Sequence, residues 1–363
     1  MDKQKDILER LGWNPIHAFN FEEEGLSDLF PARILSRDRD IYTIIGEFGS
    51  RQAEVSGHFL HKYADDYGMP VIGDFVGVRL DDDNGVIEGI VPRKTQFSRN
   101  IAGKRFKEQV IAANIDVVFI VSGLDDNYNA NRIERYITAT FDSGAKPVVL
   151  LNKTDKNPDS EKILEDLKER IPEVDFHLIS ALTGSGMDII KTVTNQKGLT
   201  FAVIGSSGVG KSTIINYLAE EEVFLTGEIR DGDSKGRHTT TKREMIFLPS
   251  GSMIIDTPGM RELQLWISSE NLMSSFPDIE EFAKNCKFSD CTHINEPGCK
   301  VVEAVENGIL DPDRYDNFIK IREEVNKTNT VRNYKFKSEK KSRDKKLAKE
   351  IRKFKKFKKD LRG

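Results

Sequence analysis

Residues 205–212 have the sequence GSSGVGKS, which matches the pattern G-x-x-x-x-G-K-[ST]. The pattern follows an apolar run (201–204) and precedes a helical run (214–218), so its backbone N–H groups can wrap phosphates beside a helix N-terminus. In such a loop Lys211 reaches the β- and γ-phosphates of a nucleotide, and Ser212 ligates Mg²⁺. The residues expected at the nucleotide phosphates are Gly205, Ser206, Ser207, Gly208, Val209, Gly210, Lys211, Ser212 and Thr213.

The sequence NKTD at 152–155 indicates which base is bound, because it follows the apolar run 147–151 at the expected end of a strand. There Asp155 can accept hydrogen bonds from both the N1–H and the 2-amino group of guanine, a pairing that adenine cannot offer. A second loop, at the end of the run 176–180, offers a backbone N–H to the base. The alternative, an ATP-dependent P-loop kinase, conflicts with NKTD. The residues expected around guanine are Asn152, Lys153, Thr154, Asp155, Ser180 and Ala181.

Two segments after the phosphate loop would complete a nucleotide switch. The sequence DTPG at 256–259 follows the apolar run MII, so Asp256 can hold Mg²⁺ through water and the N–H of Gly259 can meet the γ-phosphate. Between the two motifs lies GRHTTT at 236–241, in which one threonine would ligate Mg²⁺ in the triphosphate state. Three adjacent threonines leave the register open, and we assign the role to Thr240. An ordinary polar loop is the alternative interpretation.

The residue that orients the attacking water is less clearly marked. Position 260, where Ras-like enzymes carry a glutamine, is a methionine, and Met260 cannot orient water. His238 in the GRHTTT run is the nearest catalytic candidate, and a loop histidine without a role is its alternative. A nucleotide-gated RNA-binding factor with negligible turnover is therefore the second functional hypothesis.

All 3 cysteines of the chain lie in one short window with a histidine, in the spacing Cys286-x₄-Cys291-x-His293-x₅-Cys299. Three thiolates and one imidazole form a complete tetrahedral ligand set for Zn²⁺, and the absence of an open position indicates a structural site. A disulfide framework usually uses an even number of cysteines. We expect one structural zinc ion per chain; the alternative is three reduced cysteines with an unrelated histidine.

The surrounding pattern predicts the elements that position these residues. Five short β-like runs between residues 32 and 92 predict a small barrel, an OB-fold in preference to an SH3-like barrel. Strand-like and helical runs then alternate, which predicts a parallel α/β sheet, and a polar helical stretch surrounds the cysteines. The predicted segments are an N-terminal extension (1–29), the OB-fold barrel (30–96), an α/β nucleotide-binding domain (97–267), a helical zinc-binding domain (268–331) and a basic tail (332–363).

The charge of the chain is distributed unevenly along the sequence. Residues 332–363 contain 16 Lys/Arg against 4 Asp/Glu, whereas the whole chain carries a net charge of −4. An acidic body with a basic tail indicates a polyanionic partner, for which we prefer RNA because OB-folds often bind it. An anionic membrane surface or a solvated charge run is the alternative for the tail. No run is apolar over the roughly 18 residues that a membrane helix needs, so we expect a cytoplasmic protein.

The order of the motifs is rotated relative to common small GTPases, in which the phosphate loop comes first and NKxD and SA come last. Circular permutation preserves the places of the strands and loops in space. This order, with a barrel before it and a Cys/His cluster after it, closely resembles the ribosome small subunit-dependent GTPase A (RsgA) family. The resemblance extends roughly from Ala32 to the helix beyond Cys299.

The resemblance implies hydrolysis of GTP to GDP and phosphate, stimulated by the 30S subunit. It further implies binding to 16S rRNA within that subunit, a role in its late maturation, and a hydrophobic residue at position 260. We expect the protein to be a monomer that binds GTP with Mg²⁺ and has no membrane partner.

Overall fold

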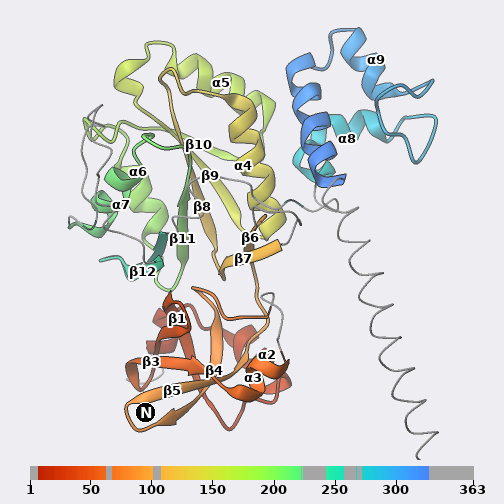
Figure 1. The fold of residues 1–363 in the computed structure, drawn as a ribbon. Coiled ribbons are helices and arrows are strands. Elements are labelled where there is room, and N and C mark those ends of the chain that lie inside the picture. Colours follow the sequence, from red (N-terminus) through yellow and green to blue (C-terminus); the bar gives the residue numbers. More distant parts are fainter. Residues whose placement is uncertain are drawn as a thin grey trace, which may run out of the picture. The chain divides into compact units, whose positions relative to one another are not determined.

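The structure is a computed structural model that describes residues 7–62, 68–100, 108–221, 223, 243–256, 267 and 272–326 (Figure 1). Its contacts divide the chain into two compact units. One comprises Met1–Ile101 and Lys107–Trp266, and the other comprises Ala102–Phe106 and Ile267–Gly363. Among the described helices, none is long and apolar enough to cross a membrane.

Five strands of the first unit form a closed barrel around an apolar core. They are β1 (Phe30–Asp38), β2 (Ile41–Gly46), β3 (Gly49–Val55), β4 (Phe75–Asp81) and β5 (Asn84–Ile90), with helix α3 (Gly57–Lys62) between β3 and β4. Their order is β1-β2-β3-β5-β4, and β1 also pairs with β4, which closes the barrel. This connectivity, with β3 and β5 parallel, is that of the predicted OB-fold.

The segment before the barrel is part of the first unit and packs within it. Helix α2 (Pro15–Glu23) is capped by Asn14, whose side chain accepts hydrogen bonds from the N–H groups of Ile16 and His17 in a capping box. Four apolar side chains of the segment are buried: Leu8, Leu11, Phe21 and Leu26. Residues 7–29 therefore contribute apolar surface to the fold of this unit.

A parallel sheet carries the predicted nucleotide motifs. Its strands are β8 (Val117–Gly123), β9 (Lys146–Asn152), β10 (Asp175–Leu178), β11 (Thr200–Ile204) and β13 (Met253–Asp256), and β12 (Arg243–Phe247) pairs antiparallel with β13. Their order is β10-β9-β8-β11-β13-β12. Helices α4 (Ala130–Ser143) and α5 (Ser160–Arg170) lie on one side of these strands, and α6 (Asp188–Thr194) and α7 (Lys211–Ala219) lie on the other (Figure 1).

The strands of this sheet are buried on both faces, which explains their continuous apolar sequence. Phe119, Val121, Phe201 and Val203 alternate along β8 and β11 and pack with Ile214 of α7 in one core cluster. The residues between them face the other layer of helices. A hairpin of β6 (Gln96–Asn100) and β7 (Glu108–Ala113) precedes the sheet.

The barrel and the parallel sheet are joined through β1. Ser36 of β1 pairs with Glu244 of β12, which makes one continuous 11-stranded sheet. The Arg33 side chain, 1% exposed, lies at this junction. It donates hydrogen bonds to the carbonyl oxygens of Leu11 at 2.5 Å, Asn114 at 3.0 Å and Gly73 at 3.2 Å.

The second unit is a small helical assembly. Its described elements are the 3-10 helix η3 (Met273–Ser275), α8 (Pro277–Ala283), α9 (Lys300–Glu306) and a helical run over 312–326. Phe276 and Phe318 are fully buried and meet edge to face, with ring centroids 5.3 Å apart. The buried Arg314 forms an ion pair with Asp278 at 2.5 Å. This core supports the loop that carries the three cysteines.

Candidate nucleotide and metal sites

The phosphate loop connects β11 to α7, as the sequence predicts. All three of its glycines have positive φ, with 144° at Gly205, 72° at Gly208 and 102° at Gly210. A Cβ at position 205 would lie 2.2 Å from the carbonyl oxygen of Val121, so a side chain there would clash with β8. The glycine pattern is thus required by both the backbone conformation and close packing.

Lys211 and Ser212 begin helix α7 directly after the loop. The ammonium of Lys211 is 2.8 Å from the carbonyl oxygen of Gly205 and also contacts that of Ser206, so it lies inside the curve of the loop. The side chain is 9% exposed. From this position the charge can meet β- and γ-phosphates, and the N-terminal end of α7 adds a favourable dipole.

Asn152 connects the NKTD motif with the phosphate loop and with the loop that contains Ala181. It is the last residue of β9 and is 2% exposed. Its Nδ2 donates to the carbonyl oxygen of Val209 at 2.7 Å, and its Oδ1 accepts the N–H of Ala181 at 2.9 Å. The role of this asparagine is therefore to hold three loops together at one edge of the sheet.

Asp155 lies in a short 3-10 helix, η1 (Thr154–Lys156), that follows β9. Its Oδ1 accepts a hydrogen bond from the hydroxyl of Ser180 at 2.5 Å. Ser180 lies two residues after β10 and is fully buried, and Thr154 donates to the carbonyl oxygen of Ile179 at 3.1 Å. These contacts fix the orientation of the carboxylate that we assign to guanine.

Asp125 is a residue of this edge that the sequence motifs did not identify. It follows β8, and its carboxylate forms an ion pair with Lys153 at 2.6 Å. Burial raises the pKa of Asp125, but the hydrogen bond and charge of Lys153, together with hydrogen bonds from the backbone N–H groups of Asn127 and Asp125, lower it, and the net pKa lies below its usual value. The available signal was its place directly after a buried strand, at the edge where NKTD also lies.

The remaining predicted residues fall at the end of β13 or outside the described residues. β13 is parallel to β11 and ends at Asp256, so the backbone of this residue lies at the same edge as the phosphate loop. Gly259, His238, Thr240 and Met260 lie outside the described residues.

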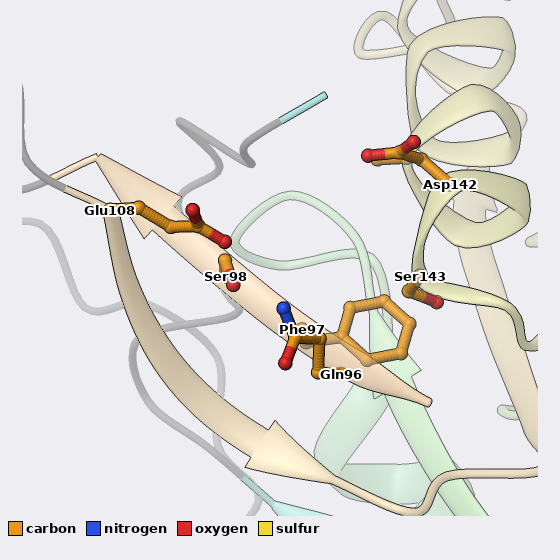
Figure 2. Close-up of a pocket in the computed structure, with 7 residues that line it drawn as sticks. Gln96, Phe97, Ser98, Glu108, Asp142 and Ser143 are labelled. Carbon is orange, nitrogen blue, oxygen red and sulfur yellow. The ribbon is translucent and has the colours of Figure 1, made fainter. Parts of the chain in front are cut away.

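A small cavity of about 50 Å³ lies between the β6–β7 hairpin and α4 (Figure 2). Glu108 and Asp142 bring carboxylates to its lining, with Ser98 and Ser143 beside them. Ser143 ends α4, and β9 starts three residues later at Lys146, so the cavity lies at the edge where the strands begin. The nucleotide motifs lie at the opposite edge, and this cavity is not part of that site.

The predicted metal ligands converge in the second unit. The ligand atoms of Cys286, Cys291, His293 and Cys299 all lie within 4.8 Å of one another. Nδ1 of His293 is 3.6 Å from the sulfur of Cys286 and 3.6 Å from that of Cys299, and these two sulfurs are 3.9 Å apart. A tetrahedral zinc ion requires separations of about 3.6 Å for sulfur–nitrogen and about 3.8 Å for sulfur–sulfur. The cluster can therefore hold a metal ion of this kind.

Backbone N–H groups of α9 stabilise the thiolates of this cluster. The N–H of Lys300 is 3.4 Å from the sulfur of Cys286, and that of Val302 is 3.5 Å from the sulfur of Cys299. Burial raises the pKa of the Cys286 thiol, but the N–H groups of Lys300 and Val301 counteract it and leave the pKa below its usual value. Tyr315 donates to the carbonyl oxygen of His293 at 2.6 Å, which fixes the loop between the ligands.

The chain is similar in sequence to a known family of proteins. A family model described as RsgA GTPase matches residues 90–266. A protein named Small ribosomal subunit biogenesis GTPase RsgA from Methanosarcina acetivorans is 40% identical over 349 residues, which cover 95% of this chain and 93% of the relative. The protein of that name from Syntrophotalea carbinolica is 39% identical over 327 residues, covering 88% and 89%. The chain belongs to the RsgA GTPase family.

Two solved structures have a fold similar to that of this chain. A crystal structure of YjeQ from Thermotoga maritima has a TM-score of 0.61 at 26% identity and covers 82% of this chain and 98% of that chain. A structure described as YloQ, a circularly permuted GTPase, has a TM-score of 0.59 at 24% identity, covering 82% and 96%. The circular permutation named for YloQ corresponds to the rotated motif order that is read from the sequence of this chain.

A second family model, described as 50S ribosome-binding GTPase, matches residues 200–334. The match begins at Thr200, the first residue of the strand before the phosphate loop. A GTPase in the conventional order begins with this strand, so the NKTD and SA loops, which lie upstream of Thr200 in this chain, fall outside the match.

Proposed function

We propose that the chain hydrolyses GTP to GDP and phosphate as a molecular switch in the biogenesis of the small ribosomal subunit. The observation that carries the proposal is the Asn152 side chain, which ties the guanine loops to the phosphate loop at one edge of the sheet. The names of the relatives, small ribosomal subunit biogenesis GTPases, supply the biological setting.

The residues at this edge of the sheet bind different parts of GTP. Asp155 accepts the N1–H and 2-amino group of guanine, while Lys153, oriented by Asp125, lies along the base. Lys211 neutralises the β- and γ-phosphates, and Ser212 ligates Mg²⁺. The roles assigned to Asp256, Gly259 and Thr240 at the γ-phosphate and Mg²⁺ complete the proposal.

Hydrolysis requires a group that orients the attacking water, and Met260 does not supply it. We propose that His238 takes this role and that the small subunit promotes it. The competing function, a nucleotide-gated RNA-binding factor with negligible turnover, is favoured by the same methionine. GTP turnover measured with and without purified 30S subunits separates the two, since stimulation supports the switch and its absence supports the binding factor.

The Cys/His cluster is proposed to hold one structural Zn²⁺ per chain. Its three thiols, its imidazole and its sulfur–nitrogen separations of 3.6 Å support this choice. When bound, the ion cross-links the loop 286–299 and supplies no catalytic chemistry. Elemental analysis of the purified protein measures the metal and its stoichiometry.

The proposed partner of the protein is 16S rRNA within the 30S subunit. An OB-fold barrel is a common RNA-binding module, and residues 332–363 bring 16 Lys/Arg against 4 Asp/Glu. We propose a monomer that acts in the cytoplasm, late in maturation of the subunit. Sedimentation of the protein with 30S particles at increasing salt tests the contact, and light scattering tests the monomer.

A further inference from the structure

The second unit contains a cavity beside its Cys/His cluster that the nucleotide site does not use. Its volume is about 320 Å³, and its lining includes Met273, Phe288, Phe318 and Arg322 together with Cys291 and His293. Pockets for small organic ligands begin at about 300 Å³. The cavity is therefore large enough for one nucleotide and too small for a duplex.

An aromatic ring at this cavity is open to solvent. Phe288 is 41% exposed, whereas Phe318, the other ring of the lining, is fully buried. The ammonium of Lys287 lies 5.5 Å from the centroid of the Phe288 ring. An exposed ring next to a cation is the arrangement on which proteins stack unpaired bases, because every base offers a flat face and carries a phosphate.

Arg322 is the charged residue of the cavity lining. Its guanidinium carbon lies 5.3 Å from the centroid of the Phe318 ring, which holds the group against one wall. Among the described residues, Arg322 has no carboxylate within ion-pair distance and no hydrogen-bond acceptor. Its planar set of donors is therefore available to a phosphate or to a base edge.

We propose that this cavity binds one unpaired RNA nucleotide, whose base stacks on Phe288 and whose phosphate contacts Arg322 and Lys287. The inference rests on the proposed role at the ribosomal RNA and gives it a defined contact in the second unit. A base in a duplex is already stacked and paired, so the site selects single-stranded positions. The competing role for Arg322 is to neutralise the thiolates of a loaded zinc site, which would make no use of Phe288.

The test uses the full-length, zinc-loaded protein with GDP and a short fluorescein-labelled oligoadenylate, followed by anisotropy. Phe288→Ala is expected to weaken binding by about five-fold or more, because stacking contributes about 1–3 kcal/mol per base. Phe288→Trp should retain binding, and Arg322→Ala should weaken it with the zinc content unchanged. Phe247→Ala, which removes a ring that is 47% exposed on β12 of the other unit, is the matched control and should bind like the wild type.

Two results would overturn the proposal. One is equal binding of the oligonucleotide by Phe288→Ala and the wild type. The other is equally effective competition by an RNA duplex or by oligoglutamate, which would mean a general anion site. GTP turnover of the wild type with 30S subunits is measured in parallel. If 30S subunits stimulate the wild type but Phe288→Ala binds the oligonucleotide as well as the wild type, only the proposal for the cavity is rejected. If 30S subunits do not stimulate the wild type, the proposed function is rejected.

Discussion

Asn152 at the end of β9 donates a hydrogen bond of 2.7 Å to the carbonyl oxygen of Val209 in the phosphate loop. The same side chain accepts the N–H of Ala181 at 2.9 Å. A Cβ at position 210 would lie 2.3 Å from its Nδ2, so Gly210 is required where the two loops meet. The guanine loops and the phosphate loop thus form one structural unit, although NKTD precedes the phosphate loop in the chain.

Asn152→Ala is expected to lower both the stability and the affinity for GTP. The change leaves the carbonyl oxygen of Val209 and the N–H of Ala181 without their partner, and an unsatisfied buried polar group costs about 1–3 kcal/mol. Chemical denaturation and GTP titration measure the two effects. The exposed Asn127→Ala is the control, and equal stability of the two variants would contradict the bridging role.

Asp155→Asn is expected to shift the preference from GTP towards xanthosine triphosphate. The replacement loses the acceptor for the 2-amino group, and a hydrogen bond to a charged group contributes about 1.5–3 kcal/mol, so GTP should bind about 10- to 100-fold more weakly. Competition between the two nucleotides measures the shift. Asp159→Asn, at an exposed residue of the same loop region, should keep the preference of the wild type. Unchanged GTP preference in Asp155→Asn would reject the assigned guanine site.

Ser212→Ala is expected to abolish Mg²⁺-dependent hydrolysis, because the first hydroxyl of α7 is the proposed Mg²⁺ ligand. The zinc content should stay near one ion per chain, since the cysteine cluster lies in the other unit. Turnover measured against the Mg²⁺ concentration, with elemental analysis of the same preparation, gives both readouts. Full activity at the usual Mg²⁺ concentration would show that the hydroxyl is not a ligand.

Cys299→Ser is expected to release zinc and destabilise the second unit. Without the metal, the thiolates stabilised by α9 lose their cross-link, and binding free energy that contributes to folding is lost. Limited proteolysis should then cleave within 272–326, while GTP binding by the first unit persists. The control is Ser289→Ala, a substitution at an exposed residue between the ligands Cys286 and Cys291. Retention of one zinc ion by Cys299→Ser would reject the four-ligand site.

His17 should make stability depend on pH. Burial and the charge of Arg33 lower the pKa of this side chain from 6.5 to about 4, so the unfolded chain takes up a proton that the folded chain excludes. The stabilisation is complete above pH 6.5 and is lost as the pH falls towards 4, by an amount of order 1–2 kcal/mol at pH 5. Urea unfolding of the wild type and His17→Gln at pH 7 and pH 5 tests this.

Glutamine is chosen for His17 because it can retain the capping box with Asn14. The pH slope of this variant should be smaller than that of the wild type. His58→Gln, at an exposed histidine, should keep the wild-type slope. Identical slopes in all three proteins would mean that His17 titrates alike in the folded and unfolded chain.

Much of the fold followed from local pattern. The five short runs with turn residues between them predicted the OB-fold, and the apolar runs before GSSGVGKS and NKTD predicted β11 and β9. The sequence pattern is less informative over 110–121, where no glycine or proline separates one apolar run from the next. The structure has β7 and β8 there, because Asn114 with φ of 55° turns the chain between them.

The sequence by itself determined the motifs, since side-chain alternation and glycine spacing act over a few residues. The residue types in these motifs predict a guanine nucleotide site and a Cys/His metal site without any knowledge of tertiary contacts. Only the tertiary structure decided that Asn152 holds Val209, that Asp125 orients Lys153, and that Phe288 and Arg322 share one cavity. These relationships depend on strand order and helix packing, which bring together residues that no local repeat connects.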